Sequence, residues 1–165
     1  MEKLIFKEIQ KFKQKWIWML LILTNGIWIW GIVQQVVFMK PFGNNPISNM
    51  GLFIIAILMI LFSIGFYNIK MITEIRKGGV YYRFSVFQFK FKKIDMHDIR
   101  SYEIKNYNSL KEFGGWGIRM QNRKNIAYNV SGNMGIQFEL KNGEKILIGT
   151  QLPNGFKKAL DKLAG

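Results

Sequence analysis

Two long stretches without a charged residue dominate the sequence. Residues 16–39 and 51–69 contain no Asp, Glu, Lys or Arg. At about 1.5 Å of rise per residue, these 24 and 19 residues form helices of about 36 Å and 28 Å, enough to cross a hydrocarbon core of about 30 Å. A soluble chain of 165 residues has too little interior to bury two helices that are apolar on every side. The sequence therefore predicts an integral membrane protein with transmembrane helices at 16–39 and 50–70.

A cleavable signal peptide is the alternative for the first stretch. Its apolar run is longer than the core of a typical signal peptide, it contains polar residues, and no small-x-small cleavage pattern follows it. We therefore expect a retained helix. Its polar residues Asn25, Gln34 and Gln35 are expected to form interhelical hydrogen bonds. The alternative role for them is a substrate pathway, which the lack of ionisable side chains within either stretch disfavours.

The connector 40–49 predicts that the two helices form an antiparallel hairpin. It contains Pro41, Gly43 and Pro46, which are residue types that end helices and form turns. Basic residues are concentrated before residue 16 and after residue 69, whereas the connector holds Lys40 alone. By the positive-inside bias, both termini should lie in the cytoplasm and the connector should lie outside a bacterial plasma membrane.

The segment 1–15 combines apolar residues at helical spacing (Ile5, Ile9 and Phe12) with lysines at other positions around the helix. Such a basic amphipathic segment can lie on an anionic leaflet before the chain enters the membrane. The alternative is a cytoplasmic extension of the first helix with its lysines in solvent. Both interpretations make the segment helical.

From Gly78 onward the sequence consists of short segments rich in β-branched and aromatic residues, and several of them alternate apolar and polar positions. Strands are expected at 80–85, 87–94, 99–105, 117–121, 126–130, 135–141 and 144–149. Asn142 and Gly143 lie between the last two, which favours a hairpin with a type I′ turn. An amphipathic helix is expected at 154–163. The expected fold class is thus α+β, with the transmembrane hairpin followed by a seven-stranded split barrel or sandwich in 78–165, capped by the C-terminal helix.

Three motifs, in order, carry a resemblance: Gly114-Gly-Trp-Gly-Ile-Arg119, Ala127-Tyr-Asn-Val-Ser-Gly-Asn-Met-Gly-Ile136 and Ile148-Gly-Thr-Gln-Leu-Pro153. Through them the chain resembles a family of uncharacterised bacterial membrane proteins in which a two-helix hairpin precedes a bacterial PH-like domain. The similarity is strongest between Phe113 and Pro153. The resemblance implies a seven-stranded PH-type split barrel with a C-terminal helix, and it implies no particular activity.

Residues with catalytic or metal-binding chemistry are few. Cysteine is absent, which excludes disulfides, thiolate metal sites and cysteine nucleophiles. The single histidine, His97, has no second histidine with which to share a metal, and it is expected to be an exposed turn residue. The glycine-rich segment 114–117 lacks the Lys-Ser/Thr pair of a phosphate loop, so it is expected to be a tight turn or bulge beside Trp116. We expect no catalytic site, cofactor or metal.

Positive charge is the most informative surface feature. The chain has 24 Lys and Arg against 10 Asp and Glu, a formal charge of +14, and the part after Lys70 has 17 basic and 8 acidic residues, or +9. In residues 87–92, alternation predicts that Phe89 and Phe91 face the core while Lys90 and Lys92 face water. This separation disfavours nucleic-acid binding, which needs aromatic and basic groups in one groove. Contact with anionic membrane lipids and a merely solvated surface are the two interpretations left open.

The expected function is a non-enzymatic interaction module at the inner leaflet, which docks a protein partner or an anionic lipid. Its expected contacts are Lys90, Lys92, Lys93, Trp116, Arg119, Arg123, Lys124 and Tyr128, with Trp116 or Tyr128 as an anchor in a loop. Under the lipid version, the soluble fragment from Gly78 should bind anionic vesicles with a strong salt dependence. The alternative is an accessory subunit whose hairpin packs against a larger transporter or membrane enzyme. An enzyme would need a deep cleft with convergent carboxylates, which we do not expect.

Overall fold

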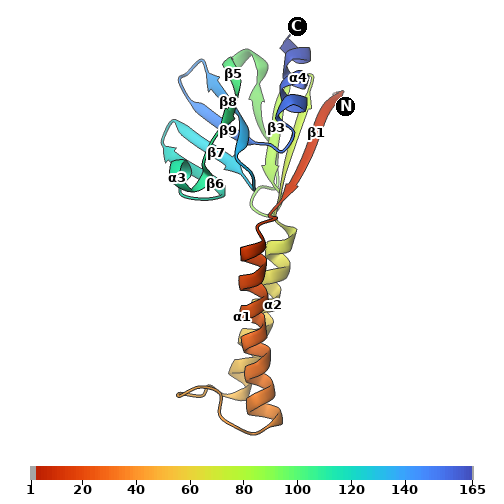
Figure 1. Ribbon diagram of the computed structural model, residues 1–165. Coiled ribbons are helices and arrows are strands. Elements are labelled where there is room, and N and C mark those ends of the chain that lie inside the picture. The colour runs from red at the N-terminus through yellow and green to blue at the C-terminus, as the bar shows by residue number, and fades with distance from the viewer. Residues whose placement is uncertain (1–2, 165) are drawn as a thin grey trace. The chain divides into compact units, whose positions relative to one another are not determined.

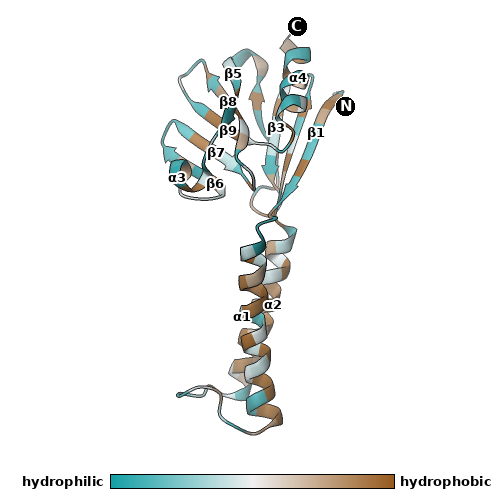
Figure 2. Ribbon diagram, viewed as in Figure 1, coloured by the Kyte–Doolittle hydropathy of each residue, from teal (hydrophilic) through white to brown (hydrophobic). Residues whose placement is uncertain are grey.

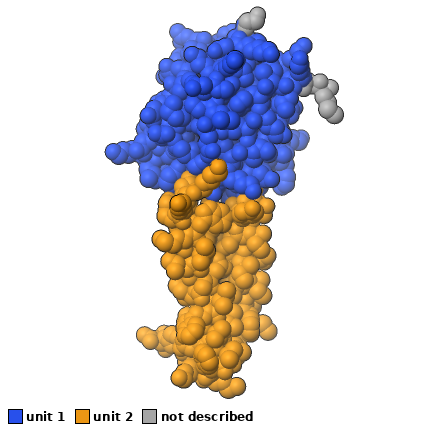
Figure 3. All heavy atoms as spheres, turned by 45° about the vertical axis from the view of Figure 1, so that its right-hand side comes forward, with its two compact units in different colours: residues 1–12, 69–165 blue, residues 13–68 orange. Residues whose placement is uncertain are grey.

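The computed structural model describes residues 3–164. The chain divides into two units, which are coloured separately in Figure 3: Lys13–Asn68 form one, and the residues up to Phe12 together with those from Ile69 onward form the other. We call them the helical unit and the sheet unit. The sheet unit is therefore built from two pieces of chain that flank the helical unit in the sequence.

The helical unit consists of α1 (Lys15–Ile32), which continues as a π-helical turn (Val33–Val37), and α2 (Asn49–Asn68). Lys15–Val37 and Asn49–Asn68, with 23 and 20 residues, are long and apolar enough to cross a membrane. Brown, hydrophobic positions predominate along both helices in Figure 2. Only 11% of each apolar window is buried, whereas the core helices of soluble proteins are mostly buried. The lengths and composition agree with the two predicted spans.

Polar contacts join the two helices. Asn25 Nδ2 of α1 donates to Ser63 Oγ of α2 at 2.8 Å, which confirms the interhelical hydrogen bond expected of Asn25. Gln34 instead bonds the connector, its Nε2 donating to the Pro41 carbonyl at 3.0 Å, because it lies in the turn that precedes the connector. Gln35 bonds both the connector and the first residue of α2.

In its described residues, the sheet unit contains two sheets, two α-helices and a 3₁₀ turn (Met96–Asp98) (Figure 1). The first sheet has the order β1-β2-β3-β4, all antiparallel, and contains β1 (Leu4–Lys11), β2 (Lys70–Arg76), β3 (Gly79–Phe84) and β4 (Lys92–Asp95). The second has the order β5-β8-β9-β7-β6 and contains β5 (Ile99–Asn106), β6 (Gly117–Asn122), β7 (Asn125–Asn129), β8 (Met134–Leu140) and β9 (Lys145–Gly149). In this sheet β7 and β9 are parallel. The helices are α3 (Ser109–Phe113) and α4 (Pro153–Ala164).

The inner faces of the two sheets and α4 enclose the main core. Phe84 and Phe138, one from each sheet, and Phe156 of α4 are at most 1% exposed. Phe156 stacks on Phe6 of β1 with ring centroids 5.3 Å apart and lies 6.2 Å from Phe138. Burying such a side chain contributes about 1.5–3 kcal/mol. The apolar side of the C-terminal helix, predicted at 154–163, thus contacts both sheets.

The order of elements corrects the prediction that the helices precede a complete sheet domain in 78–165. Leu4–Lys11 is a strand, not the amphipathic helix expected in 1–15, and it pairs along its length with β2, which the sequence analysis did not predict. Apolar residues at positions 5, 9 and 12 fit a helical period, but Glu8 and Gln10 are buried while Ile9 is 53% exposed, the alternation of a strand. Pairing with Lys70–Arg76 therefore decides the local structure.

The strand count also differs from the expected seven. The described chain has nine strands in two sheets, because β1 and β2 add to the predicted set. The predicted strand 87–94 is reduced to Lys92–Asp95, since the Gln88 amide donates to the Phe84 carbonyl at 2.8 Å and closes a turn after β3. Phe89, expected in the core, is 91% exposed, and Phe91 is half-buried.

The hairpin predicted around Asn142 and Gly143 is confirmed, but its turn type is not. The Gly143 amide donates to the Leu140 carbonyl, and the Leu140 amide donates to the Glu144 carbonyl. Gly143 has φ +82°, whereas Asn142 has no positive φ. This is a type I turn followed by a left-handed glycine, a three-residue hairpin loop rather than a type I′ turn.

Candidate functional site

The outer face of the four-stranded sheet places charged and aromatic side chains side by side. Cross-strand register aligns Lys7 with Glu74, Glu74 with Tyr81, and Tyr81 with Lys93, so one row of residues crosses all four strands. Residues directly opposite on neighbouring strands have Cβ atoms about 4.5–5.5 Å apart and interact. Strand alternation puts their neighbours at i ± 2 on the same face.

Glu74 is the buried centre of this row. Its side chain is 6% exposed, and one carboxylate oxygen lies 3.0 Å from Lys7 Nζ. The other accepts a hydrogen bond of 3.0 Å from Arg76 Nε, and Arg76 Nη2 binds the same atom. Burial by itself raises the pKa of the Glu74 carboxyl, but the hydrogen bonds from Arg76 and Lys7 outweigh burial and hold the pKa below its usual value. Glu74 thus fixes two cations on the face.

Aromatic rings separate the cations. The Arg76 guanidinium lies 4.9 Å from the ring centroid of Tyr81 and 5.5 Å from that of Phe91, and the Arg83 guanidinium lies 4.7 Å from Phe91. Lys93 Nζ is 5.7 Å from the Tyr81 ring and forms an ion pair with Asp95. Such cation–π contacts contribute about 0.5–1 kcal/mol at exposed sites, so they orient the cations without neutralising them.

This surface carries an excess of positive charge. We call it the basic face: Lys7, Lys11, Lys70, Arg76, Arg83 and Lys93, with Glu74 and Asp95. Six basic and two acidic side chains give a net charge of +4. Lys11 and Lys70 lie directly opposite each other in the β1–β2 register, an arrangement that is unfavourable for like charges. The face is therefore suited to an anionic ligand.

The predicted contact residues do not form one site. Lys93 lies on the basic face, and Lys90 lies in the loop between β3 and β4. Lys92 points to the other side of the sheet, where its Nζ donates to the Tyr128 hydroxyl at 2.9 Å. Tyr128, predicted as an anchor in a loop, is a core residue of β7: it is 2% exposed and packs edge-on against Tyr82 at 4.6 Å. An aromatic residue in an alternating strand was mistaken for a loop residue.

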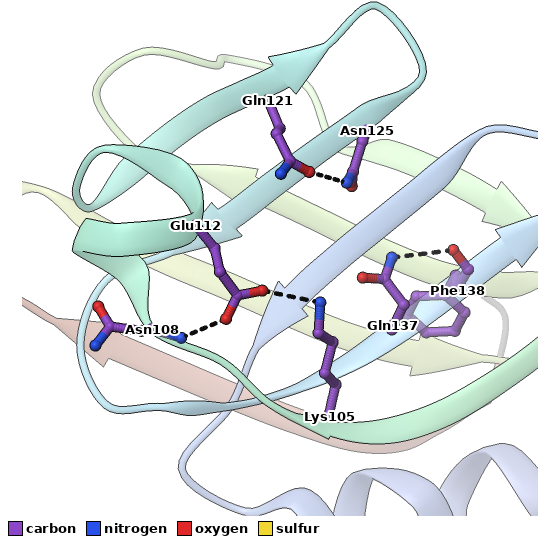
Figure 4. Close-up of polar contacts among 7 residues, drawn as sticks. All are labelled: Lys105, Asn108, Glu112, Gln121, Asn125, Gln137 and Phe138. Atoms are coloured by element: carbon purple, nitrogen blue, oxygen red, sulfur yellow. Dashed lines mark hydrogen bonds and ion pairs between the residues drawn. The ribbon is translucent and has the colours of Figure 1, made fainter.

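The remaining predicted residues lie on the β6–β7 hairpin of the second sheet. Arg119, Arg123 and Lys124 are exposed, Trp116 is half-buried, and Arg119 Nε donates to the Trp116 carbonyl at 2.9 Å. The turn is held by a side-chain hydrogen bond of 2.5 Å between Asn125 and Gln121 (Figure 4). These cations form a second, smaller basic surface on another sheet.

The glycine-rich segment ends α3, as expected of a tight turn. Gly114 has φ +68°, the left-handed conformation that glycine adopts most readily, and its amide donates to the Leu110 carbonyl. At the other end of α3, the Asn108 amide donates to Glu112 at 2.8 Å, and Lys105 Nζ lies 3.0 Å from the same carboxylate (Figure 4). The Asn108 and Lys105 hydrogen bonds lower the pKa of Glu112. The segment is structural.

Other candidate chemistry is sparse in the described residues. His97 is exposed, as predicted, and pairs with Asp98 at 3.1 Å. No group of three His, Cys, Asp or Glu within residues 3–164 is placed to hold a metal. A hollow of about 150 Å³ on the second sheet is lined by Ser101, Tyr102, Glu103, Gln137, Glu139 and Lys145. It is smaller than the 300–1,000 Å³ or so of ordinary ligand pockets.

The sequence analysis missed Lys7, Arg76 and Arg83. Lys7 lies in the segment 1–15, which was expected to be helical, either on the membrane surface or as a cytoplasmic extension of the first helix. Arg76 was counted only among the basic residues after residue 69 that predict the orientation. The signal that identifies Arg76 is the two-residue alternation in Lys70-Met-Ile-Thr-Glu-Ile-Arg76. Of the four alternate positions 70, 72, 74 and 76, all except Ile72 are charged. With that strand recognised, the charged positions fall on one face.

A protein-family model matches residues 1–163. The chain belongs to DUF6141, a family of unknown function. The DUF6141 match covers the strand before α1, both helices and both sheets. Searches of curated proteins and of solved structures gave no match. Membership of DUF6141 confirms that the chain belongs to an uncharacterised family, as the resemblance implied, and assigns no activity.

Proposed function

We propose that the protein is a non-enzymatic docking module anchored in a bacterial plasma membrane. In this proposal α1 and α2 span the bilayer, the connector 40–49 lies outside, and the sheet unit is a cytoplasmic PH-like domain. Support comes from the length and apolar surface of the helices, from the basic residues on the predicted cytoplasmic side, and from two sheets with a C-terminal helix.

The basic face recruits an acidic segment of a partner protein. The observation that carries this proposal is the net charge of +4 on one sheet face, with Lys11 opposite Lys70 and Arg76 and Arg83 held against aromatic rings. Cations that are already oriented lose less conformational freedom when a carboxylate binds. Anionic lipid headgroups are the alternative ligand for the same charges.

The test is site-specific photocrosslinking of the full-length protein in its own membrane. A photoreactive residue at Arg83 should crosslink to a protein, and the same residue at Met120, 65% exposed on β6, should not. The double variant Lys11→Glu/Arg83→Glu, with the photoreactive residue moved to Lys93, should lose the crosslink. The matched variant Arg119→Glu/Arg123→Glu, which changes the charge by the same amount on the second sheet, should keep it. Crosslinks to lipid alone would favour the headgroup version, and equal effects of both variants would contradict a specific basic face.

One observation on α1 supports an accessory-subunit role as a second candidate. A groove of about 600 Å³ between α1 and α2 is lined by apolar side chains around Asn25 and Ser63. Asn25 Oδ1 is buried and accepts no hydrogen bond within the described chain. In lipid, helices associate through close packing and polar contacts, so the apolar groove beside Asn25 and Ser63 suits the packing of another transmembrane helix. Purification in mild detergent tests the role: a lone monomer argues against a larger complex.

A further inference from the structure

The loop between β3 and β4 exposes large apolar side chains. We call residues 85–91 the aromatic loop. Phe89 is 91% exposed, Phe87 is 65% exposed and Val86 is 44% exposed. Single exposed apolar residues are common on soluble surfaces, but three within four positions at the tip of one loop form a patch. Such a patch points to an apolar partner.

The base of the aromatic loop is held firmly. The Gln88 amide donates to the Phe84 carbonyl at 2.8 Å, and Gln88 Oε1 accepts from the Phe84 amide at 3.1 Å. On the other side, Arg83 Nη1 donates to the Phe89 carbonyl at 3.1 Å while its guanidinium covers the ring of Phe91. The tip side chains are therefore presented outward by an ordered turn.

Hydrogen bonds also fix where the loop begins. The Ser85 amide donates to the Lys70 carbonyl at 2.8 Å, and the Lys70 amide donates to Ser85 Oγ at 3.2 Å. Lys70 is the second residue after Asn68, the end of α2, and it pairs with Lys11, which lies four residues before Lys15, the start of α1. The aromatic loop thus lies at the end of the sheet where β1 ends and β2 begins, as Figure 1 shows. The first residue of the loop, Ser85, is therefore hydrogen-bonded to a residue only two positions after the end of α2.

We propose that the aromatic loop inserts Phe87 and Phe89 into the interfacial region of the bilayer, on the side where the chain leaves α2. This inference rests on the proposed transmembrane helices and adds a second, non-helical membrane contact. The side chains enter the boundary between headgroups and acyl chains, as the apolar faces of interfacial segments do.

The charges around the loop fit an anionic lipid surface. Lys90 follows the tip, and Lys13 and Lys15 lie at the start of α1. No acidic residue occurs from residue 75 to 94 or from residue 9 to 73. Each Lys near an anionic leaflet is attracted to it, and long Lys side chains can keep the ammonium at headgroup level while their stems cover apolar surface. Docking to a protein is the competing explanation, because an exposed aromatic patch also suits a protein groove.

The absence of cysteine allows a direct measurement of depth. Single-cysteine variants of the full-length protein are spin-labelled and reconstituted in vesicles of phosphatidylcholine with a minority of phosphatidylglycerol. Collision rates with oxygen, which concentrates in lipid, are compared with those of a water-soluble nickel chelate. The test positions are Phe89→Cys and Phe87→Cys, whose exposed side chains can be replaced without opening the core. Leu58→Cys, 59% exposed on α2, gives the reference ratio for a position within the proposed transmembrane helix. Lys141→Cys, in the exposed β8–β9 turn, gives the reference ratio for a position in water.

The expected result is an oxygen-to-nickel collision ratio several-fold higher at Phe87 and Phe89 than at Lys141, and nearer to the ratio at Leu58. A high collision ratio at Leu58, as in lipid, together with a low ratio at both loop positions, as in water, would overturn the inference. The proposed transmembrane helices would then still hold. An aqueous ratio at Leu58 would overturn the transmembrane helices and the inference with them. Labels at Phe87 and Phe89 that neither reagent reaches would show that protein covers the loop, which also contradicts lipid insertion.

Discussion

Gln10 Nε2, on the first strand, donates a hydrogen bond of 2.7 Å to the carbonyl of Gly149, 139 positions later in the chain. Beside it, Glu8 accepts from Thr150 Oγ1 at 2.5 Å and from the Gln151 amide at 2.8 Å. These buried contacts attach the strand before α1 to the end of β9. The helices are therefore an insertion between the first two strands of the sheet unit, and not an anchor placed ahead of a complete domain.

This arrangement predicts how fragments behave. A fragment that begins at Gly78 lacks β1 and β2, half of the four-stranded sheet, and with them the fully buried Met71 and Ile75. We expect this fragment not to fold. Its binding to anionic vesicles would therefore not measure a property of the native surface. A chain that joins residues 3–12 to 69–164 through a short Gly/Ser linker should fold. Thermal unfolding followed by circular dichroism separates the two, and a cooperative transition in the Gly78 fragment would contradict the arrangement.

Glu8 should be important for the stability of the sheet unit. Glu8→Ala removes the carboxylate that accepts hydrogen bonds from the Thr150 hydroxyl and the Gln151 amide. The loss of this acceptor should lower the free energy of unfolding by about 1–3 kcal/mol. Ile9→Ala, on the exposed side of the same strand, should cost less than about 0.5 kcal/mol. Urea unfolding of the linked sheet unit measures both. Equal effects would show that β1 is held by its backbone pairing alone.

Glu74 predicts a pH dependence. Its pKa is lowered in the folded protein, so its ionised form stabilises the fold above the usual pKa of 4.5, and this contribution is lost as the pH falls through the lowered value. At pH near 7, Glu74→Gln should reduce the free energy of unfolding by about 1–3 kcal/mol, and the difference from wild type should shrink once the pH is below about 4. Urea unfolding across pH provides the measurement. Glu103→Gln, at an exposed carboxylate of β5, is the control, and a deficit in Glu74→Gln that persists undiminished in acid would exclude the ion pairs as its cause.

The parts of the fold that sequence predicts best are those governed by one local pattern. The apolar helices, the strands from Ile99 onward and the terminal helix each have one dominant period, and the structure has them within a few residues of the expected bounds. Leu4–Lys11 fits both a helical and a strand period, so its structure depends on a partner strand that lies beyond both helices in the sequence. Residues 87–91 alternate like a strand, but the Gln88 turn ends the pairing before they are reached.

The candidate site was harder to predict for the same reason. Lys7, Glu74, Tyr81 and Lys93 come from four strands, and only the register of those strands brings them into one row. Composition indicates an excess of positive charge but cannot say on which face it gathers. Tyr128, expected at the surface, is buried because β4 and β7 belong to different sheets that pack together, whereas Lys92 is exposed as expected and donates to the Tyr128 hydroxyl.

The hydrogen bond between Asn25 and Ser63 should stabilise the helical hairpin. Asn25→Ala is expected to weaken the association of α1 and α2 by about 1 kcal/mol in lipid or mixed micelles. Thr24→Ala is the matched control, because the Thr24 hydroxyl donates to Leu20 of its own helix. Unfolding in mixed micelles with rising dodecyl sulfate, followed by proximity labels on the two helices, compares the variants. If Thr24→Ala lowers the midpoint as much as Asn25→Ala, the bond between the helices is not the stabilising element.

The proposed topology combines a membrane-spanning hairpin with a sheet unit in the cytoplasm. Single cysteines at Asn44, in the connector, and at Lys141, in the β8–β9 turn, report the two sides directly when intact cells are treated with a membrane-impermeant maleimide. With this topology, Asn44→Cys is expected to be labelled in intact cells and Lys141→Cys only after permeabilisation. Labelling of Lys141→Cys in intact cells, or protection of Asn44→Cys until the cells are opened, would contradict it.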